Sequence, residues 1–281
     1  MLDYLAIGHL TVDRLATGIA PGGTVTYAAT TAVRLGLKAG LLTRAGEELD
    51  WRSHLPDVEI VRAPSLVSTS FENRYVSGRR VQHLLSLADP IQAASVPDAW
   101  RSTPVVHLGP VAHEVDSSFA GLFPHSLVCL TPQGLLRRWD DEGMVRHGKW
   151  TEDSALLDGC DVVVFSEEDL TGDAGFLTLS VERVPLVLLT QGAHGATLFH
   201  DGRSEQFRAF PVEEIDPTGA GDVFAAAFLI EYNLTGDPRH STAFACCAAS
   251  FAVERPGLGG IPDRAAVEER LALYWGMGDR G

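Results

Sequence analysis

The chain has little positive charge and no long hydrophobic run. Its 281 residues carry 22 Lys and Arg against 37 Asp and Glu, which gives a formal net charge of −15. Binding to nucleic acids depends on neutralising phosphates with Lys and Arg, so this balance argues against a nucleic-acid-binding protein. No segment approaches the roughly 18 apolar residues of a membrane helix, and we therefore expect no membrane partner.

Cysteines are few and irregularly spaced. Cys129, Cys160, Cys246 and Cys247 form no C-x-x-C or Cys/His pattern, so a zinc site has little support. The N-terminus lacks the basic region and cleavage site of a secretory signal. These features predict a cytoplasmic protein with buried thiols.

Two common nucleotide-binding motifs are also missing. The chain has no G-x-x-x-x-G-K-[ST] sequence, which excludes a P-loop kinase, and no strand-linked G-x-G-x-x-G of a dinucleotide dehydrogenase. Hydrophobic residues make up 45% and charged residues 21%, values ordinary for a globular protein. The length fits one large α/β domain or two small ones.

Short apolar runs alternate with longer helical patterns along the chain. Expected strands cover residues 4–8, 40–44, 105–109, 127–130, 162–166 and 186–190. Expected helices cover residues 24–35, 117–123, 151–157, 169–179, 219–232, 239–254 and 263–274. Continuously apolar strands are covered on both faces, so this order predicts an α/β fold with a doubly wound, mostly parallel sheet flanked by helices.

Residues 58–87 break this rhythm, because their polarity alternates as in exposed strands. Ser77-Gly78 supplies a turn, which indicates a hairpin. On pattern alone, two interpretations are open: a lid over a substrate crevice, or an edge hairpin of the main sheet.

The stretch Asp216-Pro217-Thr218-Gly219-Ala220-Gly221-Asp222 precedes an apolar helical run. Small residues at a helix start let backbone N–H groups point into one space, where the helix dipole favours an anion. Gly219, Ala220 and Gly221 would supply this anion hole for a phosphoryl group. Asp222 would then act as a general base on the attacking hydroxyl. The alternative is an ordinary acidic residue in a first helical turn.

This stretch resembles the second signature of the ribokinase (phosphofructokinase-B, PfkB) family of carbohydrate kinases. Four further blocks resemble the family in the same order, and together they extend from residue 5 to about 257. They are residues 7–13, Pro21-Gly22-Gly23 with the following helix to residue 36, residues 189–196 and residues 248–257.

The resemblance implies one ribokinase-like domain over residues 1–281, with a small β-hairpin lid formed by about 9–22 and 62–88. It implies an ATP-dependent kinase that uses Mg²⁺ and phosphorylates a hydroxyl of a sugar or cyclic polyol. The implied substrate-binding residues are Asp13, Gly22 and Gly23. The implied nucleotide-binding residues are Ser166, Thr190, Gly192, Gly195, Thr218, Gly219, Gly221 and Cys246.

Three positions depart from the family pattern. Ser166 and Asp169 stand where the family has Asn-x-x-Glu, so Asp169 would handle Mg²⁺ indirectly and with a shorter side chain. Tyr27 replaces an Asn that contacts sugar, and Cys246 replaces an Asn beside the base. Asp216 has either a structural or monovalent-cation role, as the resemblance implies, or a plain capping role.

Two short stretches resemble the myo-inositol kinase branch of the family. One is residues 131–137, in which Gln133 and Arg137 would face the crevice, although they could equally be surface residues. The other is residues 88–98. Tyr27 also suits that branch, as a substrate-binding residue that could offer an apolar face to the ring. The alternatives are a nucleoside or ordinary sugar kinase, or a non-catalytic relative that binds a small ligand. We expect a monomer or homodimer.

Overall fold

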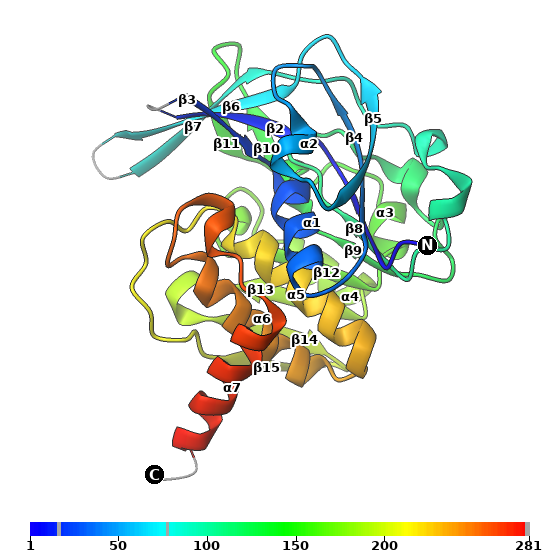
Figure 1. Ribbon diagram of the computed structural model, residues 1–281. Helices are drawn as coiled ribbons and strands as arrows, with labels where there is room; N and C mark the ends of the chain where they lie inside the picture. The colour runs from blue at the N-terminus through cyan, green and yellow to red at the C-terminus, as the bar shows by residue number, and fades with distance from the viewer. Residues whose placement is uncertain (16–17, 77–78, 279–281) are drawn as a thin grey trace.

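The computed structural model of the protein describes residues 1–15, 18–76 and 79–278 (Figure 1). Its centre is a nine-stranded sheet in the order β15-β14-β13-β12-β9-β8-β1-β4-β5. Strands β1 to β13 of this sheet pair in parallel, while β14 and β15 extend it antiparallel. Their bounds are β1 Tyr4–Ile7, β4 Ala39–Ala45, β5 Val58–Pro64, β8 Val105–Leu108, β9 Leu127–Leu130, β12 Val162–Ser166, β13 Leu186–Thr190, β14 Ala196–His200 and β15 Arg203–Phe207. The predicted doubly wound, mostly parallel sheet is confirmed.

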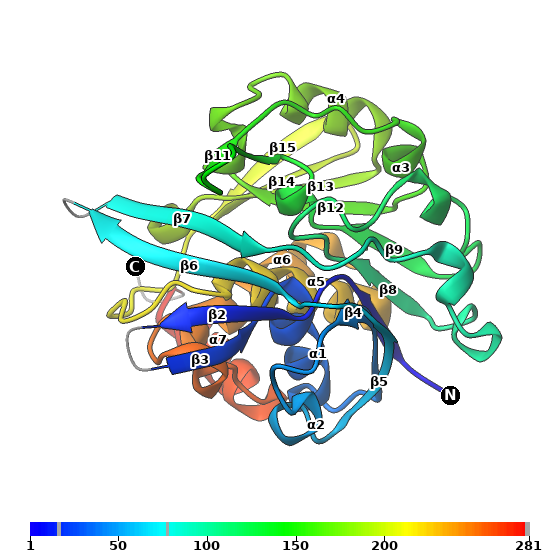
Figure 2. The ribbon, with the colours of Figure 1, turned by 90° about the horizontal axis from the view of Figure 1, so that it is seen from above.

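Helices cover both faces of this sheet (Figure 2). One face carries α1 Thr24–Arg34, α5 Ala220–Thr235, α6 Pro238–Ala252 and α7 Arg264–Gly278; the other carries α3 Ala155–Asp158 and α4 Phe176–Arg183. Two hydrophobic clusters fill the layers, one on each face. The remaining short helical segments are α2 Trp51–His54, η1 Ala93–Ser95, η2 Asp98–Trp100, η3 Ser117–Phe119, η4 Pro132–Gly134, η5 Asp169–Thr171, η6 Gly192–His194 and η7 Gly257–Gly260.

The helices expected on the α3/α4 face are shorter than predicted. The expected helix 117–123 is only the 3-10 turn η3, because Gly121 adopts a positive φ of 69°. The expected helix 151–157 begins only at Ala155, in α3. Residues 169–179 divide into η5 and the start of α4, with Gly172 and Gly175 between them. Glycine disfavours continuation of a helix, so the helical pattern is interrupted at these two residues.

A second sheet of four strands stands above the large one (Figure 1). Its order is β3-β2-β6-β7, with β2 Thr11–Leu15, β3 Gly18–Gly22, β6 Thr69–Val76 and β7 Arg79–Ser86. The expected hairpin is therefore β6–β7, whereas residues 58–64 form β5 at the edge of the large sheet. The second pair of strands in the small sheet, β6 and β7, therefore begins at Thr69 and not near residue 62. The expected turn at Ser77-Gly78 lies outside the described residues.

The chain crosses between the two sheets at His9, a fully buried residue. One ring nitrogen of His9 bonds Thr69 Oγ1 at 2.7 Å, and Nε2 bonds the Asp89 carbonyl at 2.9 Å. These contacts join the entry into β2, the entry into β6 and the exit from β7. The exit from β3 lies there too, because a Cβ on Gly23 would press against the His9 carbonyl. All four crossings therefore meet at one side chain and its backbone.

Glu114, which is 2% exposed, supports this meeting point. Its carboxylate accepts the backbone N–H groups of His9 at 2.8 Å and Ala112 at 2.7 Å, and also that of Val111. A carboxylate buried in this way is stabilised by several N–H donors, so it fixes three backbone N–H groups in two segments at once.

A second hairpin, β10 Arg137–Trp139 and β11 Val145–His147, lies beside β7. The sequence patterns did not predict it. The Leu84 N–H of β7 donates to the Gly143 carbonyl in its turn at 2.8 Å. The hairpin therefore connects the small sheet to the body of the protein.

Candidate active site

The candidate site lies where the strand order of the large sheet reverses. β1 has β4 on one side and β8 on the other, and the chain returns to β8 only after the small sheet is complete. Ligands of open α/β sheets bind beyond the carboxyl ends of the strands at such a switch point. Gly8 and Gly109 end the two strands, and a Cβ on Gly8 would overlap the Gly109 carbonyl. The first turn of α1 packs directly on these two glycines, so α1 begins over the switch point.

Residues 219–222 form the start of α5. Gly219 is the N-cap with a positive φ of 79°, and Asp222 lies in the first turn. The Tyr27 ring of α1 packs against Gly219 so closely that a Cβ there would overlap it. The predicted anion hole is thus a true helix start, where N–H groups and the helix dipole face an anion. Tyr27 is 6% exposed and packs against this turn.

Asp222 is surrounded by the other predicted charged residues. Burial raises the pKa of Asp222 to about 6, and the charges of Asp169 and Asp13 also raise it. A hydrogen bond from the Thr24 side chain and the charge of Arg137 lower it. The fold therefore brings together Asp13, Asp169, Arg137 and Asp222, which are far apart in the sequence. A carboxylate with this pKa is a stronger base than an exposed aspartate, yet is still mostly ionised at neutral pH.

Asp13 lies on β2 directly against the diglycine. A Cβ on Gly22 would overlap the Asp13 carboxylate, and Thr11 Oγ1 donates to Asp13 Oδ1 at 3.1 Å. Gly23 has a φ of 87° and precedes the first turn of α1. Gly22 therefore leaves room for the Asp13 side chain, and Gly23 is required by its positive φ and by the nearby His9 carbonyl, whatever ligand binds there.

Gln133 and Arg137 interact with each other. Arg137 is 8% exposed and donates to Gln133 Oε1 at 2.7 Å and to the Val111 carbonyl at 3.2 Å. Its guanidinium group also lies 5.3 Å from the centroid of the Phe71 ring on β6. Arg137 is thus a buried residue between the small sheet and Asp222 and not a surface residue beyond a strand.

Ser166 and Asp169 form a closed unit after β12. Asp169 Oδ2 accepts hydrogen bonds from the Ser166 backbone N–H at 2.9 Å and from its hydroxyl at 2.8 Å. Asp169 is 3% exposed, and its Oδ1 has no hydrogen-bond partner among the described residues. An unpaired buried carboxylate oxygen is costly, so this atom fits a cation or its water shell.

The predicted nucleotide residues lie in different environments. Thr190 ends β13, and Gly192 follows it in an exposed turn with a φ of 54°. Gly195 closes that turn, and a Cβ on it would overlap the Phe207 carbonyl of β15. Residues 186–200 thus form the antiparallel β13–β14 hairpin. Cys246 is 6% exposed within the core packing of α6, where burial raises its pKa to about 12.

Asp216 ties two loops together. Its Oδ1 accepts the Thr218 N–H at 3.0 Å, and its Oδ2 accepts the Gly257 N–H at 3.4 Å. These contacts are those of a carboxylate that caps a turn.

Two residues near the acids were not predicted from the sequence. Thr24, 3% exposed, bonds Asp222, and His147 Nδ1 of β11 lies 4.0 Å from Asp169 Oδ1. Thr24 follows the diglycine directly, so the signature itself could have indicated it. His147 had no comparable signal, because only the pairing of β10 with β11 brings it to the site.

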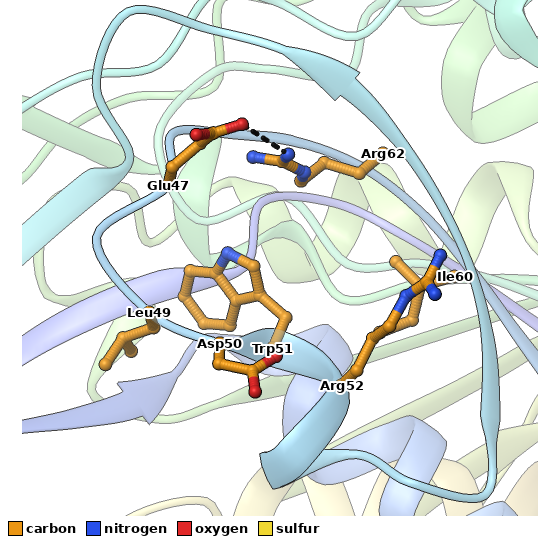
Figure 3. A pocket seen from close by; sticks show the side chains of 7 residues that line it. All are labelled: Glu47, Leu49, Asp50, Trp51, Arg52, Ile60 and Arg62. Atoms are coloured by element: carbon orange, nitrogen blue, oxygen red, sulfur yellow. Dashed lines mark hydrogen bonds and ion pairs between the residues drawn. The ribbon is translucent and has the colours of Figure 1, made fainter.

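A hollow of about 470 Å³ lies elsewhere, around Trp51 between α2 and the edge strand β5 (Figure 3). Arg62 and Glu47, whose ion pair spans 3.2 Å, form part of its wall. Trp51 donates to the Gly46 carbonyl at 3.4 Å. None of the predicted site residues lines this hollow.

Comparisons with known proteins agree with this geometry. Residues 146–264, which include Asp169 and the 216–222 loop, match the model of the pfkB family carbohydrate kinases. A nucleoside kinase from Methanothermobacter thermautotrophicus is 26% identical over 98% of this chain and 97% of its own length.

Solved structures with the same fold include a pyrophosphate-dependent kinase in the ribokinase family. In its sulfate complex, it has a TM-score of 0.80 and 25% identity to this chain, covering 95% of this chain and 99% of the other. A pyrophosphate-dependent kinase in the ribokinase family, complexed with a pyrophosphate analog and myo-inositol, has a TM-score of 0.77, also at 25% identity, with the same coverage of both chains. The chain therefore carries a pfkB family carbohydrate kinase domain, and its relatives and structural neighbours indicate a phosphotransferase.

Proposed function

We propose that this enzyme transfers the γ-phosphoryl group of ATP to a hydroxyl of a cyclic polyol such as myo-inositol. The observation that supports this proposal most directly is Asp222, held at the start of α5 among Asp13, Asp169 and Arg137. In the proposed reaction, Asp222 accepts the proton of the attacking hydroxyl. The N–H groups of Gly219, Ala220 and Gly221 stabilise the charge that develops on the transferred group.

The proposed acceptor site lies between β2 and β10. The Asp13 carboxylate can accept hydrogen bonds from two neighbouring hydroxyls, and Arg137 has five N–H donors for the remaining oxygens. Arg137 is held by Gln133 and Val111, so its position is fixed before the substrate binds. Gly22 and Gly23 let the backbone approach the ring. Tyr27 supports Gly219 and, in this proposal, also offers an apolar face to the ring of the acceptor.

The proposed donor site lies on the side of Ser166, Thr190, Gly192, Gly195 and Thr218. Mg²⁺, when bound, would neutralise charge on the donor phosphates. Asp169 fits such a group, because its buried Oδ1 lacks a partner in the described part of the chain. Cys246 would act only as an apolar wall. A monovalent cation near Asp216 remains part of the proposal, although the carboxylate already caps its own loop.

Two other substrates have specific support. The name of the Methanothermobacter relative favours a nucleoside as acceptor. Pyrophosphate is a second candidate donor, because both solved structures described above are pyrophosphate-dependent kinases. A ligand-binding relative without activity has no such support, since the family comparison identifies a phosphotransferase.

The test is a panel of acceptors assayed with each donor. Myo-inositol should give the highest kcat/KM, and ribose, fructose and nucleosides should give lower values. A site that hydrogen-bonds several hydroxyls rejects analogues that leave its polar groups unpaired. Arg137→Ala should reduce kcat/KM for the polyol and leave the KM for ATP nearly constant. A tenfold preference for ribose, fructose or a nucleoside would refute the polyol assignment.

We further propose a cytoplasmic enzyme that acts as a monomer or homodimer. All four cysteines are free and buried, as suits a reducing compartment. In the part of the chain that the structure describes, no helix combines the length and apolar character needed to cross a membrane. Sedimentation of the purified chain would determine the oligomeric state.

A further inference from the structure

One face of the β10–β11 hairpin carries both Arg137 and His147. The two residues are directly opposite in the antiparallel register. Opposite residues of such a pair project to the same face, with Cβ atoms about 4.5–5.5 Å apart. The charge of Arg137 lowers the pKa of Asp222, and His147 Nδ1 lies 4.0 Å from Asp169 Oδ1. This face therefore extends from the proposed base to the second buried acid.

The hairpin is held firmly on the side of Asp169. Gly148 N–H donates to the Leu136 carbonyl at 2.7 Å, and Trp150 N–H donates to Asp173 Oδ2 at 3.0 Å. A Cβ on Gly172 would press on the backbone of residues 147 and 148. His147 is consequently positioned by backbone contacts on both sides, and its location does not depend on a flexible loop.

The space between His147 and Asp169 is suited to a third group. A separation of 4.0 Å is too long for a hydrogen bond, so the imidazole does not satisfy Asp169 Oδ1. That oxygen is buried and has no partner among the described residues. The His147 side chain is 38% exposed, so a ligand can reach it. An N–H donor and an unpaired carboxylate oxygen together match a phosphate with its hydrated cation.

Building on the proposed function, we propose that His147 binds the diphosphate unit of the phosphoryl donor. Its N–H donates to an oxygen of the phosphate that remains with the leaving group. Arg137, from the same face, remains on the acceptor side beside Asp222, so the two residues serve the two different substrates of the reaction. A diphosphate unit is common to ATP and inorganic pyrophosphate, so this assignment holds for either donor.

The experiment measures donor binding directly by isothermal titration calorimetry with Mg²⁺. Two non-hydrolysable probes are used, methylenediphosphonate for pyrophosphate and AMP-PCP for ATP. His147→Ala should raise the Kd of the probe that the wild type binds by about 10- to 100-fold, the scale of losing a hydrogen bond to a charged group. His147→Gln restores an N–H donor and should recover part of the affinity.

The control is Arg146→Ala on the same strand. Arg146 precedes His147, so its side chain projects to the opposite face, where it is 68% exposed and pairs with Asp140. This variant removes a full charge from the hairpin and should leave both Kd values unchanged. Thermal melting of all three variants verifies that they are folded.

Each outcome has one meaning. A loss confined to methylenediphosphonate supports the site with an inorganic donor, and a loss confined to AMP-PCP supports it with a nucleotide donor. Unchanged affinity in His147→Ala, or an equal loss in Arg146→Ala, overturns the inference while the turnover of polyol by the wild type still supports the proposed function. If the wild type neither binds a probe nor phosphorylates any acceptor, the proposed function fails as well.

Discussion

The glycines around Asp222 fall into two regions with opposite surroundings. On the side of α1 and the small sheet, Gly22, Gly23 and Gly219 are each pressed by another part of the protein. On the side proposed for the donor, Gly192 and Gly221 have no described atom within 4 Å of the position that a Cβ would take. The first region needs glycine for its own packing. In the second region, Gly192 still needs glycine for its positive φ of 54°, and Gly195 needs it because a Cβ would overlap the Phe207 carbonyl. Gly221 has neither constraint, so a requirement for glycine at Gly221 must come from a ligand.

Asp222 lies where these two regions meet, so its replacement should affect chemistry and leave both regions intact. We expect Asp222→Asn to lower kcat by about 10²–10⁴-fold, the usual scale for losing a general base. The amide has nearly the same shape but is a far poorer proton acceptor. Donor affinity, measured by calorimetry, should change little. Turnover above about half of the wild-type value would remove Asp222 from the role of base.

The contrast between the regions is sharpest at Gly219 and Gly221, two residues apart in one loop. Gly219→Ala should reduce the free energy of unfolding by about 1–3 kcal/mol, because the methyl group meets Tyr27 and φ is positive. Gly221→Ala should leave stability unchanged or raise it by up to about 1 kcal/mol, since alanine favours a helix.

Urea unfolding of the two variants measures this difference, and donor KM measures the ligand requirement. Gly221→Ala should raise the KM for the donor despite its normal stability. Equal stability of both variants would mean that the two regions do not differ as described.

The buried charge of Asp222 should also be visible in the pH dependence of stability. Its folded-state pKa of about 6 lies above the ordinary value of 3.8. The folded state therefore holds the proton more tightly, and stability falls as pH rises from about 4 to about 6. Because the Asp222 side chain is partly exposed, we reduce the expected loss in the free energy of unfolding to about 2 kcal/mol.

Asp222→Asn lacks this titration, so it serves as the reference against which the wild type is compared. The stability difference between the variant and the wild type should grow from pH 4 to pH 6 and then stay constant above pH 7. A difference that is independent of pH would show that burial does not raise the pKa of Asp222.

The smallest expected effect concerns the donor region alone. Asp169→Ala should raise the Mg²⁺ concentration for half-maximal rate several-fold, because Mg²⁺ keeps most of its waters and is often held indirectly. Glu168→Ala removes an exposed neighbouring acid and should leave the magnesium titration unchanged. An unaltered titration in Asp169→Ala would assign Asp169 only to the Ser166 turn.

Local patterns were enough to predict the parts of the site that are formed by one segment. The turn followed by a helix at 216–222 depends on neighbouring residues, and the structure has it as expected. The β10–β11 hairpin was missed because its strands have only three residues each and carry charges, so no apolar alternation marks them. His147 reaches Asp169 only through cross-strand register, which a single sequence does not encode locally.

The sequence left two interpretations of residues 58–87 open, an edge hairpin of the large sheet or a lid. In the structure, one part of this segment joins the large sheet and the other part joins the small sheet. Residues 58–64 pair with β4, while β6 pairs with β2 and β7 pairs with β6. Alternating polarity identifies a half-exposed strand but not the sheet to which it belongs, because partner choice depends on residues far along the chain.

The junction at His9 and Glu114 has a consequence for cooperativity. Four chain crossings depend on hydrogen bonds and contacts around this one buried pair, so no strand of the small sheet can detach at its base without disturbing the others. We therefore expect local opening to occur as one unit, with the backbone amides of His9, Ala88 and Ala112 exchanging together. Asp13, four residues after His9, would move with that unit, so under the proposed function acceptor capture and the ordering of the small sheet would be one equilibrium.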